Sequence, residues 1–456
     1  MALYALSTYH KYIRMSYTSY LFRRTVFVPV ITLTTALVAG SCTQPKIPTF
    51  SKVASYAQSR NINDEDRDEY STGSLIFSPD GQYLVSENHA QKYQIVVWDI
   101  QEDTEVMRLR EPRISGGISF DPYGGQFALP NLDAVAVFLT QPIMGSAQLT
   151  LEEGNGFVET AFNPHRPMLL STYFDHSELE TDESEKFVAV WDFKNKEEIL
   201  KLPYGLVEAA SFGADGDSLI TGGVDGTLRV WDIESGNEVS RIDLGDTIAL
   251  DEVDSEGAGI IPSRVGAVPG SQYIWATSYS SSPNSFFGVW DSESGEAIWI
   301  EYDLYWGIPA AVSADGQTAA AIQNVAEAPR VDPTLSVWDM QSGKEIVQVE
   351  STEECTFTWG NNRSLSLSAD GSYLATRCFY QPGGGSSTSS DDISRTEHYI
   401  AIFDLENGVK TLFPLDDWRR DYRRTFSFSQ DGQRLAVKYI SEDRVGVDVW
   451  DIQWGN

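Results

Sequence analysis

The residues best suited to chemistry lie in one short, basic and aromatic segment near the C-terminus. Four arginines occur there within six positions, which is unusual in a chain this acidic. Guanidinium groups bind carboxylate or phosphate groups through paired hydrogen bonds. The alternative is that these arginines neutralise neighbouring acidic loops. The candidate binding surface consists of Trp418, Arg419, Arg420, Tyr422, Arg423 and Arg424.

The first 42 residues have the organisation of an export signal. They contain Lys11, Arg14, Arg23 and Arg24 and no acidic residue, and an almost uncharged apolar run follows over residues 25–40. A basic region, an apolar region and small residues before a cut are typical of such a signal. The apolar run is short for a membrane span. This segment has three possible roles: a signal that ends in a lipidated cysteine, an uncleaved membrane anchor, or an ordinary cleaved signal.

The end of this segment, Ala39-Gly40-Ser41-Cys42, resembles the lipobox of bacterial lipoproteins. The resemblance implies that Cys42 is diacylated and becomes the mature N-terminus. Acyl chains would then hold a soluble domain at a membrane surface. The family usually has Leu where Ala39 stands. The expected location is the bacterial cell envelope, on the periplasmic side of the outer or inner membrane.

The other two cysteines, Cys355 and Cys378, form an even pair once Cys42 is lipidated. In an oxidising compartment such a pair can form a disulfide. The alternative is two inert buried thiols. The five histidines are scattered, and the sequence contains no zinc-protease helix, nucleophile elbow or phosphate-binding glycine loop. We therefore predict a non-enzyme without a metal or cofactor.

The charge limits the partners. The whole chain carries −33, and removal of the four basic residues in positions 1–42 lowers this to −37. Such a surface repels nucleic acid and anionic lipid headgroups. No nucleic-acid partner is expected, and the protein is expected to be a monomer.

These residues must be positioned by a repeated unit, because an aromatic-Asp pair recurs along the chain. Recurrence of one short signature indicates copies of one structural unit. Asp-Gly hairpin signals precede most of the pairs, as at Asp215-Gly216, and a second turn follows each one before a fourth apolar stretch. The pairs are Trp98-Asp99, Trp191-Asp192, Trp231-Asp232, Trp290-Asp291, Trp338-Asp339, Phe403-Asp404 and Trp450-Asp451.

Four short strands per unit resemble the WD40 family, and the resemblance covers residues 74–456. It implies an all-β, single β-propeller. The best copy spans 209–244 and places Thr221, Asp225 and Trp231 in family positions. The family's Gly-His dipeptide is missing, so its Asp–His–Ser/Thr–Trp hydrogen-bond network cannot be complete.

We count eight four-stranded blades, including a degenerate unit over 118–139, with seven blades as the alternative. Because the chain stops soon after the last Trp-Asp, an N-terminal strand over 50–58 is expected to complete the final blade. The predicted organisation is therefore an export signal (1–42), a tether with an acidic linker and the closing strand (43–73), and the propeller (74–456).

The Asp-Gly turns are short, whereas the segments expected on the opposite face are long and irregular, for example 173–185, 323–334 and 379–398. Long loops on a rigid scaffold often carry binding sites; the alternative is tolerated insertions. We predict a membrane-tethered, non-catalytic scaffold that binds a protein or glycan through this loop-rich face. One alternative is a lipoprotein similar to the eight-bladed outer-membrane assembly factor. Another is a propeller enzyme, since residues 292–299 resemble the tryptophan-docking repeat of quinoproteins.

Overall fold

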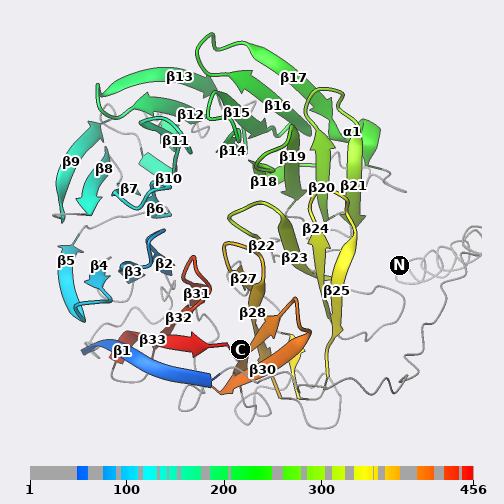
Figure 1. Ribbon diagram of the computed structural model, residues 1–456. Coiled ribbons are helices and arrows are strands. Elements are labelled where there is room, and N and C mark those ends of the chain that lie inside the picture. Colours follow the sequence, from blue (N-terminus) through cyan, green and yellow to red (C-terminus); the bar gives the residue numbers. More distant parts are fainter. Residues whose placement is uncertain are drawn as a thin grey trace, which may run out of the picture. The chain divides into compact units, whose positions relative to one another are not determined.

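Eight antiparallel sheets form the blades of one β-propeller (Figure 1). The computed structural model describes residues 49–59, 75–88, 94–110, 117–130, 134–140, 143–150, 156–175, 185–203, 207–248, 260–278, 285–302, 311–323, 333–352, 354–357, 365–380, 398–414, 426–440 and 444–454. Two compact units divide the chain, Met1–Gln44 and Pro45–Asn456, and all described residues belong to the second. The predicted boundaries at residues 42 and 73 therefore stay predictions.

The first four blades follow the chain in order, and each runs from its inner to its outer strand. Their strands are β2 Leu75–Phe77, β3 Tyr83–Asn88, β4 Gln94–Asp99 and β5 Thr104–Arg110; β6 Ser119–Phe120, β7 Gln126–Pro130, β8 Ala134–Thr140 and β9 Ile143–Thr150; β10 Gly156–Phe162, β11 Met168–Asp175, β12 Glu185–Asp192 and β13 Glu197–Pro203; β14 Ala209–Phe212, β15 Ser218–Gly222, β16 Thr227–Asp232 and β17 Glu238–Asp243. The degenerate second unit is thus a complete blade, as predicted.

A short helix, α1 (Leu244–Thr247), follows the fourth blade. The remaining strands are β18 Pro262–Ala267, β19 Tyr273–Ser278, β20 Phe286–Asp291 and β21 Ala297–Tyr302; β22 Ala311–Val312, β23 Thr318–Gln323, β24 Thr334–Asp339 and β25 Glu345–Glu350; β26 Thr356–Phe357, β27 Leu365–Leu367, β28 Tyr373–Phe379, β29 His398–Asp404 and β30 Val409–Pro414; β31 Phe426–Phe428, β32 Arg434–Ile440 and β33 Arg444–Gln453. In the seventh blade, β26 and β27 both pair with β28, so two short pieces share the place of the inner strand.

The eighth blade is completed by the first strand of the chain, as predicted. Strand β1 (Thr49–Ser59) pairs antiparallel with β33 (Figure 1, blue beside red). Ser55 and Lys52 both contact the buried Asp448 carboxylate, each at 2.7 Å. Both ends of the propeller therefore meet in one blade, which is how a ring of sheets protects its edges.

The core consists of eight apolar layers, one between each pair of neighbouring blades. Side chains alternate between the faces of a strand, so each strand serves two layers. On β16, Trp231 packs toward the third blade while Leu228 and Val230 pack toward the fifth. The repeated tryptophans therefore hold one blade against its predecessor, and the scaffold is rigid on both sides of every sheet.

A regular slip of register marks the outer strands. The outer strand has one extra residue, a β-bulge, between the residue that pairs with the repeated aromatic and the residue that pairs with the position before it. In the fourth blade, Trp231 pairs with Glu238, whereas Val230 pairs with Ser240. Seven of the eight outer strands carry such a bulge: β1, β5, β9, β13, β17, β21 and β25.

Candidate functional site

Most of the sequence-predicted site is expected on the loop-rich face. Its loops connect the second strand of a blade to the third, or one blade to the next. The candidate binding surface at Trp418–Arg424 and the lipidation residue Cys42 lie outside the described residues, as do the central parts of the long loops. What the structure describes in full detail is the opposite face, which we call the turn face because the Asp-Gly turns form it.

Four turns on this face, in the first, sixth, seventh and eighth blades, are organised by a serine and an aspartate two residues later. In the sixth blade, Ser313 Oγ donates to Asp315 Oδ1 at 2.6 Å and accepts from Thr318 N at 3.0 Å. Asp315 Oδ1 also accepts from Gln317 N at 3.0 Å. The same arrangement recurs around Asp80, Asp370 and Asp431. These hydroxyls and carboxylates form hydrogen bonds within their own turns, so they form a fixed surface.

The fourth blade reaches the same result with the serine on the other side of its turn. Gly213 stands where the other turns have serine, and Ser218 Oγ donates to Asp215 Oδ1 at 2.9 Å. A Cβ atom on Gly213 would lie 1.9 Å from this hydroxyl. One hydroxyl therefore replaces the other in the same space, which the sequence spacing alone did not indicate.

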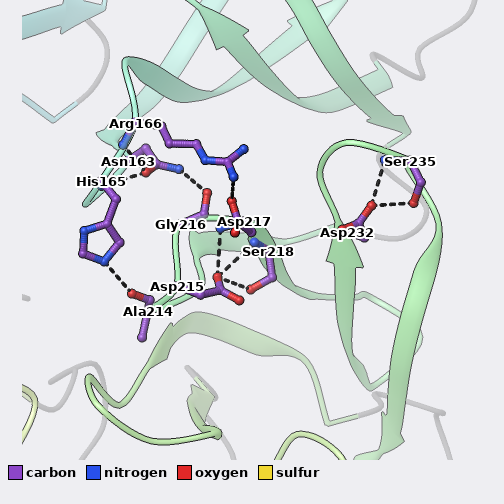
Figure 2. Close-up of polar contacts among 10 residues, drawn as sticks. All are labelled: Asn163, His165, Arg166, Ala214, Asp215, Gly216, Asp217, Ser218, Asp232 and Ser235. Atoms are coloured by element: carbon purple, nitrogen blue, oxygen red, sulfur yellow. Dashed lines mark hydrogen bonds and ion pairs between the residues drawn. The ribbon is translucent and has the colours of Figure 1, made fainter.

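Neighbouring turns are bonded to one another across the blades, as Figure 2 shows for the third and fourth blades. Asn163 Nδ2 donates to Gly216 O at 2.7 Å, and His165 Nε2 donates to Ala214 O at 3.0 Å. Arg166 and Asp217 form an ion pair across the same boundary. This histidine is thus part of the turn surface, as expected for a loop histidine.

Two of the repeated tryptophans use the hydrogen-bond partners that remain without the family's histidine. Trp231 Nε1 donates to Thr221 Oγ1 at 2.9 Å, and Trp191 Nε1 donates to Ser171 Oγ at 2.8 Å. Asp225 instead contacts Arg229, which is 5% exposed and also donates to Thr227 Oγ1 at 3.0 Å. Sequence reasoning missed this arginine, although it lies four residues after Asp225 on the same hairpin.

The pKa of Asp225 reflects this environment. Burial opposes its ionisation, but hydrogen bonds from Thr227 and the charge of Arg229 outweigh burial, so the pKa of Asp225 lies below its ordinary value. The pKa values of two aspartates of the Trp-Asp pairs are also lowered, for another reason. The Ser235 hydroxyl and amide lower the pKa of Asp232, and the Asn195 amide lowers that of Asp192. Both groups stay charged and bonded at neutral pH.

Cys355 and Cys378 are joined by a disulfide, with their Cα atoms 5.1 Å apart. Cys355 precedes β26 and Cys378 lies near the end of β28. Both are buried in the apolar layer between the sixth and seventh blades. The bond therefore ties the split inner strand to its neighbour, at the end of the sheet from which residues 381–397 leave.

Among the described residues, no group of three or more His, Cys, Asp or Glu side chains is arranged to hold a metal ion. The same residues include no helix that is long and apolar enough to cross a membrane. The polar groups of the turn face are engaged in turn hydrogen bonds. This arrangement can present a rigid surface to a partner.

The ring of eight antiparallel blades, with its repeated aromatic-Asp pairs, defines an eight-bladed β-propeller. Residues 200–232 match the family described as "WD domain, G-beta repeat". The chain is 22% identical to Transducin beta-like protein 3 of Bos taurus over 55% of this chain and 30% of that protein. It is 28% identical to Serine-threonine kinase receptor-associated protein of Dictyostelium discoideum over 28% of this chain and 45% of that protein. The chain thus spans less than half of either relative. Together with the eight-bladed ring, these matches support a WD40 propeller.

Proposed function

We propose that this chain is a non-catalytic scaffold that holds a protein partner on its loop-rich face. The contrast between the two faces carries the proposal. The turn face is short, repetitive and bonded across blades, as at Asn163–Gly216. The opposite face carries the long segments that vary from blade to blade. Variation on one face of a fixed framework is what a binding site requires, and WD40 propellers generally bind protein partners.

The Trp418–Arg424 segment is the proposed anchor on that face. Its four arginines stand in a chain with 66 acidic and 33 basic residues. A partner that presents carboxylate groups would gain bidentate hydrogen bonds there. Elsewhere the acidic surface would repel the same partner, so the cluster also fixes the partner's orientation.

Replacement of Arg419, Arg420, Arg423 and Arg424 with Ser is expected to reduce partner capture by about tenfold or more, since several charge-assisted hydrogen bonds are lost. Capture is measured by quantitative mass spectrometry after affinity purification from detergent-solubilised envelope. The matched control removes the same charge from the turn face by replacing the exposed Arg166, Lys194, Lys196 and Lys344 with Ser. Unchanged capture in the first variant, or equal loss in both, would remove the cluster from the site.

We further propose that the scaffold is tethered to a bacterial envelope membrane through a lipid on Cys42. The basic and apolar segment before Cys42 supports export, and the acyl chains would supply the membrane affinity that the acidic propeller lacks.

Replacement of Cys42 with Ser is expected to move the protein from the membrane fraction to the soluble fraction. Mass spectrometry of the wild-type N-terminus should show a diacylated residue 42. A mature N-terminus elsewhere without lipid would show an ordinary signal, and an intact N-terminus would show an uncleaved anchor. Either result would contradict the lipoprotein proposal.

A further inference from the structure

Within the described residues, the outer strand of each blade pairs with a neighbouring strand on one side alone, so it forms a sheet edge. Such an edge is a template for another strand, and a β-bulge is one of the devices that prevent this pairing. Seven outer strands of this propeller carry a bulge at the same place, between the residue that pairs with the repeated aromatic and the residue that pairs with the position before it.

The extra residue of these bulges is an exposed, β-branched apolar side chain in six cases. Their exposed fractions run from 36% for Ile298 to 62% for Val239. A bulky side chain at an irregular backbone position obstructs an approaching strand. The six residues are Val53, Val106, Ile199, Val239, Ile298 and Ile346.

Strand β30 of the seventh blade is the exception among the eight outer strands. Its pairing with β29 runs without a slip from Asp404–Val409 to Tyr399–Pro414. Phe403 pairs with Lys410 and Ile402 with Thr411. In the fourth blade the corresponding partners are Glu238 and Ser240, with Val239 between them. β30 thus lacks the one residue that makes the bulge, and its edge stays regular.

The hydrogen-bond pattern indicates which groups face outward. The turn before β30 closes with Gly408 N donating to Asp404 O at 2.9 Å, which makes Asp404–Val409 the first bonded pair. Bonded and non-bonded pairs then alternate along an antiparallel ladder. The amides and carbonyls of Lys410 and Leu412 therefore point away from β29. Pro414, which has no N–H to donate, occupies the next outward position, where a proline is tolerated.

We propose that the edge of β30 binds an extended, basic segment of a partner protein, which adds to the seventh blade as a further strand. The regular ladder supplies the main-chain hydrogen bonds of this recognition mode. Figure 1 shows β30 on the rim of the ring. The net charge of −33 selects a basic segment. The same charge disfavours a second copy of this chain, because two acidic rims would repel. The proposal does not rest on the proposed function, so its failure would leave that function standing.

The test uses the full chain and a synthetic peptide of about eight residues in which Lys and Val alternate, and it measures amide hydrogen exchange. The peptide is expected to slow exchange over Lys410–Phe413 by about tenfold or more. Lys410→Pro should abolish this protection, because it removes an outward amide. The matched control is Glu345→Pro, since Glu345 pairs with Trp338 as Lys410 pairs with Phe403. This variant should keep the protection.

A second variant restores the bulge by inserting Val between Lys410 and Thr411. It should lose the protection while retaining the wild-type denaturation midpoint, which separates edge blocking from misfolding. An acidic peptide in which Glu and Val alternate should not protect β30. The proposal is overturned by absent protection in the wild type, by equal protection of β1 or of the bulged edges, or by equal effect of the acidic peptide. Protection without peptide in a dimer, shown by light scattering, would make a second copy the occupant and also overturn it.

Discussion

A chain that begins after residue 59 is expected to lose most of its resistance to unfolding. The loss of β1 removes three kinds of interaction at once. It removes the ladder with β33, the stacking of Tyr56 on Trp98 at 4.9 Å and the packing of Phe50 against Phe413 at 5.1 Å. It also exposes the edge of β33, which invites pairing between chains.

The truncation also removes both partners of one buried carboxylate. Asp448 is 4% exposed and interacts with Lys52 and Ser55. Without β1 the carboxylate loses both partners. A buried charge left without its partner costs about 3–5 kcal/mol. Since a folded domain is stable by only about 5–15 kcal/mol, the truncated propeller is expected to be largely unfolded or aggregated at room temperature.

The measurement is urea denaturation followed by tryptophan fluorescence. The matched control begins at residue 45 and therefore keeps β1, and its midpoint should equal that of the full chain. Addition of a synthetic peptide that covers residues 45–59 to the shorter chain should restore a cooperative transition. A truncated chain that unfolds at the same urea concentration as the control would show that β1 does not hold the ring closed.

The second large effect is expected at a glycine where neighbouring turns meet. Gly316 has φ +66°, and a Cβ atom there would lie 2.0 Å from Cδ of Pro269 in the preceding blade. The proline ring is stiff and cannot move aside cheaply. Gly316→Ala therefore combines a left-handed backbone with an overpacked contact, and we expect a loss of about 3–5 kcal/mol.

Gly81→Ala is the matched control, because Gly81 lies in the equivalent turn of the first blade with φ +70° and nothing within 4 Å of an added Cβ. Only the cost of the left-handed conformation applies there, about 1–2 kcal/mol. Thermal denaturation of the two variants separates the contributions. Equal losses would mean that contact between turns contributes nothing and that backbone conformation explains both.

The arrangement of the blades was accessible from sequence because it depends on local spacing. The aromatic-Asp pairs and Asp-Gly turns recur in fixed order, so the eight blades, the degenerate second blade and the closing strand could all be predicted. The role of Arg229 could not, because it depends on which side chain fills the space left by a missing histidine. The replacement of one hydroxyl by another at Gly213 and Ser218 depends equally on three-dimensional proximity.

The unbulged edge of β30 could not be predicted from the spacing of the repeated motifs. The aromatic pairs with the residue seven positions later in both the seventh and the fourth blades, and the registers differ by one position only at the preceding residue, at Ile402–Thr411 and Val230–Ser240. A register difference this small gains meaning only when the ladder shows which residue is missing. For the Trp418–Arg424 segment, sequence indicates the chemistry of the side chains, and their positions lie outside the described residues.

The closing strand also sets the order of folding. Ser55 and Asp448 are 393 positions apart in the chain, yet they share a hydrogen bond. The other seven blades are each built from consecutive strands, so each can form soon after its own residues are available, as in other repeat proteins. The eighth blade must wait until both remote segments are present. Ring closure is therefore the slow step, because it forms contacts between residues far apart in the chain. Until that step is complete, a nascent chain exposes β1, the strand that later pairs with β33.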